Sequence, residues 1–193
     1  MSDAANEFLR SSELLSQTDS KLLIVDVQEK LLSSIPVVDR MIGNCRRLIQ
    51  GAQILQIPVY ATEQYPKGLG TTTQTLAELL DDILEKLRFS CSEALNWGSA
   101  GEQADDRHKV VVAGIEAHVC VQQTVLDLIA RGFQVYVPAD AIASRYKLDW
   151  QVALDRMSLC GAVVTTTESI LFEWCEVAGT PEFRQISKLI TEQ

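Results

Sequence analysis

Short apolar runs alternate with amphipathic helical stretches along most of this chain, and this alternation limits the folds that the chain can adopt. Residues 110–115 (VVVAGI) are apolar throughout, which is typical of a strand buried on both faces of a sheet. Residues 38–55 place apolar side chains at spacings of three and four, which predicts a helix with one apolar stripe. Strands that alternate with helices form a mostly parallel sheet with helices on both faces. We therefore predict an α/β fold.

The predicted sheet has six strands, at residues 21–27, 57–61, 83–89, 110–115, 133–137 and 162–165. Further helices are expected near residues 75–80, 119–131 and 150–159, and from about Pro181 onward. Gly132 and Gly161 are placed to end two of them. Thr165 and Glu168 have the spacing of a capping box at the start of another helix.

The length and charge of the chain narrow its class. Its 193 residues fit a polar N-terminal segment over residues 1–20 and one folded domain over residues 21–193. The net charge of −9 repels polyanions, so we expect no nucleic-acid partner and no anionic membrane surface. We find no signal peptide and no apolar run of membrane-spanning length, so we expect a cytoplasmic location.

Polar side chains follow the predicted strands at the point where each one ends. In parallel sheets ligands bind beyond the C-terminal edge, so chemistry is expected among these residues. They are Asp26, Glu63, Gln64, Lys86, the segment 116–120 and Asp140.

Cys120 is the candidate nucleophile, because it lies where a central strand turns into a helix. A helix N-terminus carries partial positive charge and unpaired N–H groups, which would stabilise a thiolate and a developing oxyanion. The competing interpretation is an inert buried cysteine. The five cysteines are scattered and contain no Cys-x-x-Cys pair, which argues against a disulfide framework. We assign Cys45, Cys160 and Cys175 to packing and regard Cys91 as a pocket-lining candidate.

Asp26 and Lys86 are the candidate partners of this thiol. Taken singly, Asp26 could cap backbone N–H groups and Lys86 could be a solvated lysine. A buried pair of the two would offset the desolvation of each group and leave the thiol beside a base. His118 lies two residues before Cys120, so the two side chains diverge, and we interpret it as a pocket or turn residue. Neither His118 nor His108 has metal-site spacing, and we expect no metal.

Several segments resemble the isochorismatase-like cysteine hydrolases, in the same order and with similar spacing. The nucleophile segment is GIEAHVCVQQTVLDLIARG (residues 114–132), the first strand is LLIVDVQEKL (22–31) and the lysine segment is KLRFS (86–90). Further similarity covers TEQYPKGLG (62–70), PADAIASR (138–145) and TTTES (165–169). The resemblance extends over nearly the whole chain from about Lys21.

This resemblance implies a three-layer α/β/α sandwich and a Cys120–Asp26–Lys86 triad. In that family the Asp is the base, the Lys stabilises charge, and a thioester forms on the Cys during hydrolysis of a small amide, imide or ester. The resemblance also implies a cis peptide bond at 115–116, an oxyanion hole from the backbone N–H groups of Glu116 and Cys120, and a homo-oligomer. Our pocket candidates are Gln28, Gln64, Tyr65, Phe89 and His118. The loop 140–145 is a candidate interface.

Two departures from the family narrow the prediction. Its metal-binding nicotinamidases carry histidines after the second strand, whereas residues 62–66 (TEQYP) contain none, so we expect no metal and no other cofactor. Isochorismatase itself does not use a cysteine nucleophile, which argues against isochorismate as substrate. Two other hypotheses stay open, namely a non-catalytic scaffold that keeps the fold and a redox sensor at Cys120.

Overall fold

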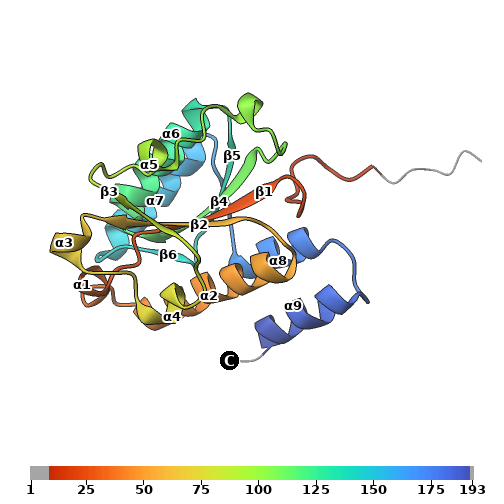
Figure 1. Ribbon diagram of the computed structural model, residues 1–193, viewed down its shortest axis with the longest axis horizontal. Helices are drawn as coiled ribbons and strands as arrows, with labels where there is room; N and C mark the ends of the chain where they lie inside the picture. Colours follow the sequence, from red (N-terminus) through yellow and green to blue (C-terminus); the bar gives the residue numbers. More distant parts are fainter. Residues whose placement is uncertain (1–8, 192–193) are drawn as a thin grey trace, which may run out of the picture.

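The computed structural model describes residues 9–191 as a three-layer α/β/α sandwich around a parallel sheet (Figure 1). The order of the strands is β3-β2-β1-β4-β5-β7, and β6 pairs with β4 beside this path. The strands are β1 Ser20–Val25, β2 Val59–Gln64, β3 Ile83–Lys86, β4 Lys109–Ile115, β5 Gln134–Pro138, β6 Ile142–Ala143 and β7 Val163–Thr165. The predicted parallel α/β sheet is confirmed.

Helices cover both faces of this sheet. They are α1 Glu29–Leu32, α2 Val38–Ile54, α3 Pro66–Leu69, α4 Gln74–Ala77, α5 Ser92–Leu95, α6 Gln122–Ala130, α7 Lys147–Leu159, α8 Thr167–Cys175 and α9 Pro181–Thr191, with a 3₁₀ turn at Ala100–Glu102 and a π-helical turn at Ala117–Val121. In Figure 1, α2, α8 and α9 lie below the sheet and α5, α6 and α7 lie above it. Side chains alternate between two cores accordingly. In β4, Val111 and Ala113 face α2, whereas Val110 and Val112 face the α6 side.

The reversal of strand order next to β1 positions the functional edge. After β1 the chain adds β2 and β3 on one side, and β4 then returns to the other side of β1. The carboxyl ends of β1 and β4 therefore flank the topological switch point, where α/β sheets bind their ligands. The segment before β1 also packs on the domain, since Leu15 is fully buried in the core below the sheet.

Several predicted boundaries were wrong. The strand β2 begins at Val59 and not at Ile57, and α7 begins at Lys147, before the predicted residue 150. The helix expected at 119–131 is a π-helical turn followed by the shorter α6. The N-cap of α8 is Thr166, whose hydroxyl accepts from the N–H of Ser169, and not Thr165.

Gly114 in β4 lies against the backbone of β1. Its φ is +120°, and a Cβ at this position would lie 2.1 Å from the carbonyl oxygen of Val25. Gly161 has a comparable φ of +107°, but nothing lies within 4 Å of its Cβ position. The two glycines therefore separate the cost of a positive φ from the cost of a steric clash.

We expect Gly114→Ala to lower the free energy of unfolding by about 3 kcal/mol or more, because it adds backbone overlap to an unfavourable φ. Gly161→Ala is the control and should cost about 1–2 kcal/mol, from φ alone. Urea unfolding of both variants measures the difference. Equal losses would contradict the close approach of β1 and β4.

Candidate active site

Asp26 follows β1 directly and is completely buried. Its φ of +51° is left-handed, a conformation that Asp tolerates better than most residues, and its N–H donates to the carbonyl of Thr62 at 3.1 Å. The Thr62 hydroxyl donates to Oδ1 at 2.8 Å, and the Lys86 ammonium donates to Oδ2 at 2.7 Å. Both carboxylate oxygens therefore have strong partners inside the protein.

Lys86 reaches Asp26 from two strands away. Adjacent strands are about 4.8 Å apart, so only a long side chain at the end of β3 can cross β2 and contact a residue that follows β1. Its ammonium also donates to Gln64 Oε1 at 2.9 Å and to the carbonyl of Phe89 at 2.8 Å. The side chain is only 3% exposed, and these acceptors replace the water that it has lost.

Cys120 lies in the π-helical turn between β4 and α6 and is 5% exposed. Its thiol interacts electrostatically with the side chains of Asp26 and Lys86. Its carbonyl accepts from the Thr124 hydroxyl at 2.7 Å, and the same hydroxyl oxygen accepts from the N–H of Cys91 at 2.9 Å. The structure therefore brings Cys120, Asp26 and Lys86 together at one edge of the sheet.

Burial dominates the ionisation of this cluster. It raises the pKa of Asp26, although the Lys86 charge and the hydrogen bonds from Cys120, Lys86 and Thr62 act in the opposite direction. Burial also raises the pKa of Cys120, and the negative charge of Asp26 adds to this effect. The resting sulfur is thus a thiol, and the thiolate expected from the helix N-terminus is not the resting state. Asp26 is a stronger base than an ordinary carboxylate and lies beside that thiol.

The pocket candidates lie in different surroundings. Gln28 is fully buried, and its amide bonds the backbone of Gln64 and Gly70. Gln64 contacts Lys86, as described above. Tyr65 and Phe89 are about half exposed, at the ends of β2 and β3. His118 bonds the Ser144 hydroxyl at 2.9 Å through Nδ1 and faces Asp149 of α7.

Two contacts at this edge were missed from the sequence. Thr62 bonds Asp26, and it could have been found from strand alternation, because Thr62 and Gln64 lie two residues apart on the same face. Glu116 accepts hydrogen bonds from the N–H and the Nε of Arg145, both at 3.1 Å. No sequence signal joins these two residues, which are 29 positions apart. The peptide bond between Ile115 and Glu116 is cis, at the position that the resemblance implies.

The other cysteines have three kinds of environment. Cys45 is buried, as predicted, and burial raises its pKa to about 12. Cys91 is also buried, with a pKa raised to about 11 by burial, and its sulfur lies 3.3 Å from the Thr62 hydroxyl. Cys160 is exposed, so its assignment to packing was wrong, and Cys175 is half-buried. Among residues 9–191, no group of three or more His, Cys, Asp or Glu side chains is arranged to hold a metal ion.

The parallel sheet between two helical layers, with its polar cluster beyond the C-terminal edge, defines a doubly wound α/β protein. Within the described residues, no helix is both long and apolar enough to span a bilayer.

Comparison with known proteins specifies the family. The model of the isochorismatase domain matches residues 20–169, and the chain therefore belongs to the isochorismatase family. Isochorismatase domain-containing protein 1 of Danio rerio is 40% identical over 180 residues, which are 91% of this chain and 62% of that protein. This chain thus spans less than two thirds of that relative's length.

Two solved structures are similar along most of the chain. MAR1 ribonuclease from Caenorhabditis elegans has a TM-score of 0.82 and 39% identity and covers 92% of each chain. The YcaC gene product of Escherichia coli, described as an octameric hydrolase of unknown specificity, has a TM-score of 0.82 over 94% of this chain and 92% of its own. At 23% identity, the YcaC likeness shows the fold alone.

Lys86→Met tests the electrostatics of the buried pair. It leaves an ionised Asp26 buried without its counter-charge, and we expect a loss of about 3–5 kcal/mol in the free energy of unfolding near neutral pH. Removing the positive charge raises the pKa of Asp26 further above its unfolded value. The variant should therefore be least impaired in acid, where Asp26 stays protonated in the folded state, and should lose stability as the pH rises from the unfolded pKa toward the raised folded pKa.

Urea unfolding at about pH 5 and about pH 8 measures this dependence. The double variant Asp26→Asn/Lys86→Met is the control, because it removes both charges and should show little of the pH dependence. A loss in the single variant that is the same at both pH values would contradict the assignment.

Proposed function

We propose that this chain is a cysteine hydrolase in which Cys120 is the nucleophile, Asp26 the base and Lys86 the charge-stabilising partner. The observation that carries the proposal is the buried cluster in which Lys86 holds the Asp26 carboxylate at 2.7 Å and that carboxylate interacts with the Cys120 thiol. A scaffold that performs no chemistry has no need to bury an ammonium, a carboxylate and a thiol together.

The proposed reaction follows from the protonation states of the site. Asp26 takes the thiol proton as Sγ adds to the substrate carbonyl carbon. The carbonyl electron pair moves to oxygen, which accepts hydrogen bonds from the backbone N–H groups of Glu116 and Cys120. The C–N or C–O bond then breaks, and Asp26 returns the proton to the leaving group. A thioester remains on Cys120.

Water completes the cycle. Asp26 removes a proton from a water molecule, which adds to the thioester, and the departing sulfur takes the proton back from Asp26. Lys86 keeps its charge throughout and holds the carboxylate in position. Small amides, imides and esters are the proposed substrate class. The half-exposed rings of Tyr65 and Phe89 are the proposed pocket wall.

Two broader features belong to the same proposal. We infer a homo-oligomer, as the resemblance to the isochorismatase-like hydrolases implies. We also keep the cytoplasmic location as a proposal, which fractionation of the tagged protein tests.

RNA cleavage is a second candidate function, favoured by the 39% identity to MAR1 ribonuclease. The net charge of −9 opposes it, because RNA binding relies on cations along the path of the phosphates. Incubating RNA with the wild-type chain and with Cys120→Ser tests it. If the wild type cleaves RNA and Cys120→Ser does not, RNA cleavage would replace acyl transfer as the proposed function.

We expect Cys120→Ser to lower turnover at least about 1,000-fold without loss of the fold, because a buried serine beside Asp26 is a much weaker nucleophile. A panel of amides, imides and esters, read by product release, supplies the substrate, and mass spectrometry locates the acyl adduct. Cys160→Ser is the matched control and should keep full activity, since Cys160 is exposed. If the wild type releases product from none of these compounds, the scaffold hypothesis is favoured.

Thr62→Val tests the role of Asp26 as the base. The Thr62 hydroxyl lowers the pKa of Asp26, so its removal should raise that pKa. The acid limb of the rate of p-nitrophenyl acetate cleavage should then move to higher pH by about 0.5–1 unit, for a hydrogen bond worth about 1 kcal/mol.

Thr72→Val is the control for this shift, because the buried Thr72 hydroxyl has no hydrogen-bond partner among the described residues. Its pH profile should match that of the wild type. A Thr62→Val limb that stays in place or moves to lower pH would rule out Asp26 as the titrating base.

A further inference from the structure

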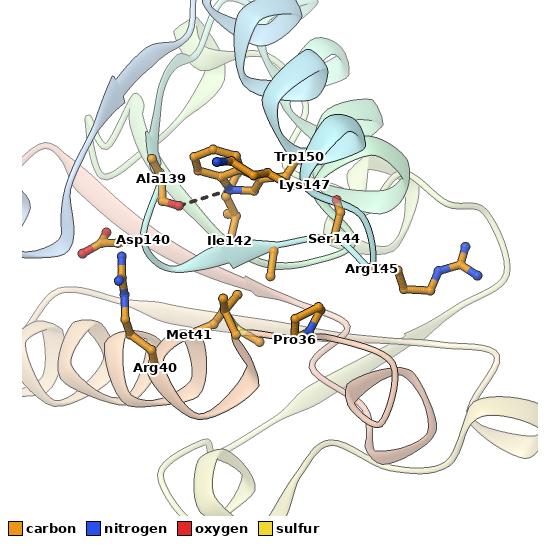
Figure 2. A pocket seen from close by; sticks show the side chains of 12 residues that line it. Pro36, Arg40, Met41, Ala139, Asp140, Ile142, Ser144, Arg145, Lys147 and Trp150 are labelled. Carbon is orange, nitrogen blue, oxygen red and sulfur yellow. Dashed lines mark hydrogen bonds between the residues drawn. The ribbon is translucent and has the colours of Figure 1, made fainter.

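A cavity of about 380 Å³ lies beside the nucleophile turn, between the start of α2, the β6 loop and the start of α7 (Figure 2). Its volume is within the range of small-molecule sites. Its wall is bonded to the nucleophile turn, since Ser144 bonds His118 and Arg145 bonds Glu116. Cys120, Asp26 and Lys86 do not line it, so it is distinct from the proposed catalytic pocket.

Apolar side chains from both helices form the body of the cavity. Met41 comes from α2, Ile142 from β6 and Trp150 from α7, as Figure 2 shows. The Trp150 ring is fixed, because its Nε1 donates to the carbonyl of Ala139 at 3.2 Å. A fixed indole offers a flat apolar surface, and the flexible Met41 side chain adapts to the shape of an occupant.

Positive charge gathers at one end of this apolar cavity. Figure 2 shows Arg40 reaching up from α2 and Lys147 reaching over from α7, toward the end where Ala139 and Asp140 lie. Neither cation forms a salt bridge with another residue between 9 and 191.

The acidic residue at this end is already engaged. Asp140 Oδ1 accepts from the N–H of Thr167 at 2.9 Å and from its hydroxyl at 3.0 Å, so this carboxylate is held at the start of α8. The third cation on the lining, Arg145, donates its Nε to Glu116. Asp140 keeps its negative charge beside Arg40, so Arg40 and Lys147 together leave this end of the lining with one excess positive charge.

We propose that this cavity binds a small carboxylic acid with an aromatic or branched aliphatic body. The carboxylate lies between Arg40 and Lys147, and the body packs on Trp150, Ile142 and Met41. Cationic side chains from two walls attract an anion to this end of the cavity, and the apolar floor favours an anion that carries an apolar body. This binding requires no reaction at Cys120 and extends beyond the proposed hydrolysis.

The test uses 3-phenylpropionate as probe and 3-phenylpropanamide as its neutral isostere. Isothermal titration measures both affinities on the full chain. Fluorotryptophan labelling gives separate ¹⁹F signals for Trp97, Trp150 and Trp174, and Trp150→Phe assigns the signal of interest. We expect the acid to bind at least about tenfold more tightly than the amide, to shift the Trp150 signal alone, and to weaken with added salt.

Two charge variants sharpen the test. Arg40→Met/Lys147→Met keeps the length of both side chains and should abolish the preference for the acid. Arg46→Met/Arg156→Met removes the same charge from exposed positions of the same two helices and should leave the preference intact.

Several outcomes would overturn the proposal. Equal binding of the acid and the amide would show that the cations do not recognise the carboxylate. An unchanged Trp150 signal would show that the acid does not bind in this cavity. Protection of Cys120 against iodoacetamide without a change at Trp150 places the acid in the catalytic pocket. If no acid binds and Arg40→Met/Lys147→Met alters the sedimentation of the chain, the cavity is a contact between two copies. If the chain hydrolyses none of the amides, imides and esters, the binding of the acid in this cavity is still tested independently.

Discussion

The buried ion pair of Lys86 and Asp26 is the interaction on which the rest of the site depends. Neither charge could remain in this core alone, because each would lose several kcal/mol of hydration. Their contact at 2.7 Å holds the ends of β1 and β3 in register across β2. Both further partners lie on the intervening strand: Gln64 accepts a hydrogen bond from Lys86, and Thr62 donates one to Asp26. One pair thus connects three strands and sets the position of the proposed base.

The pair also explains why the thiol is protonated at rest. Asp26 is negative and next to Cys120, so it opposes a second negative charge there, and burial acts in the same direction. The same two causes make proton transfer to Asp26 favourable when a carbonyl carbon accepts the sulfur electrons. In the proposed reaction, the sulfur stays a thiol until a bound substrate excludes water and accepts the charge.

Sequence reasoning predicted the sheet from its apolar runs. It also predicted the convergence of Asp26, Lys86 and Cys120, because the residues that follow parallel strands meet at one edge of the sheet. It missed β6, since a strand of two residues has no periodicity. It missed the π-helical turn and placed Cys120 in an ordinary helix start. It also expected a stabilised thiolate, because the cost of burial depends on neighbours that only the folded chain brings together. The cavity was beyond prediction for the same reason, as its walls come from segments about 100 residues apart.

The strand β4 has two different neighbours on one side, β5 and the short strand β6. The first half of β4 pairs with β5, from Lys109 to Val111, whereas Gly114 and Ile115 pair with β6. The chain between β5 and β6 is a turn of three residues, 139–141, and two of them, Ala139 and Asp140, line the cavity. Insertions or deletions in that turn would resize the cavity while β1, β2 and β3 keep their spacing. In this way, relatives that keep the same cluster at the sheet edge can differ in what they bind beside it.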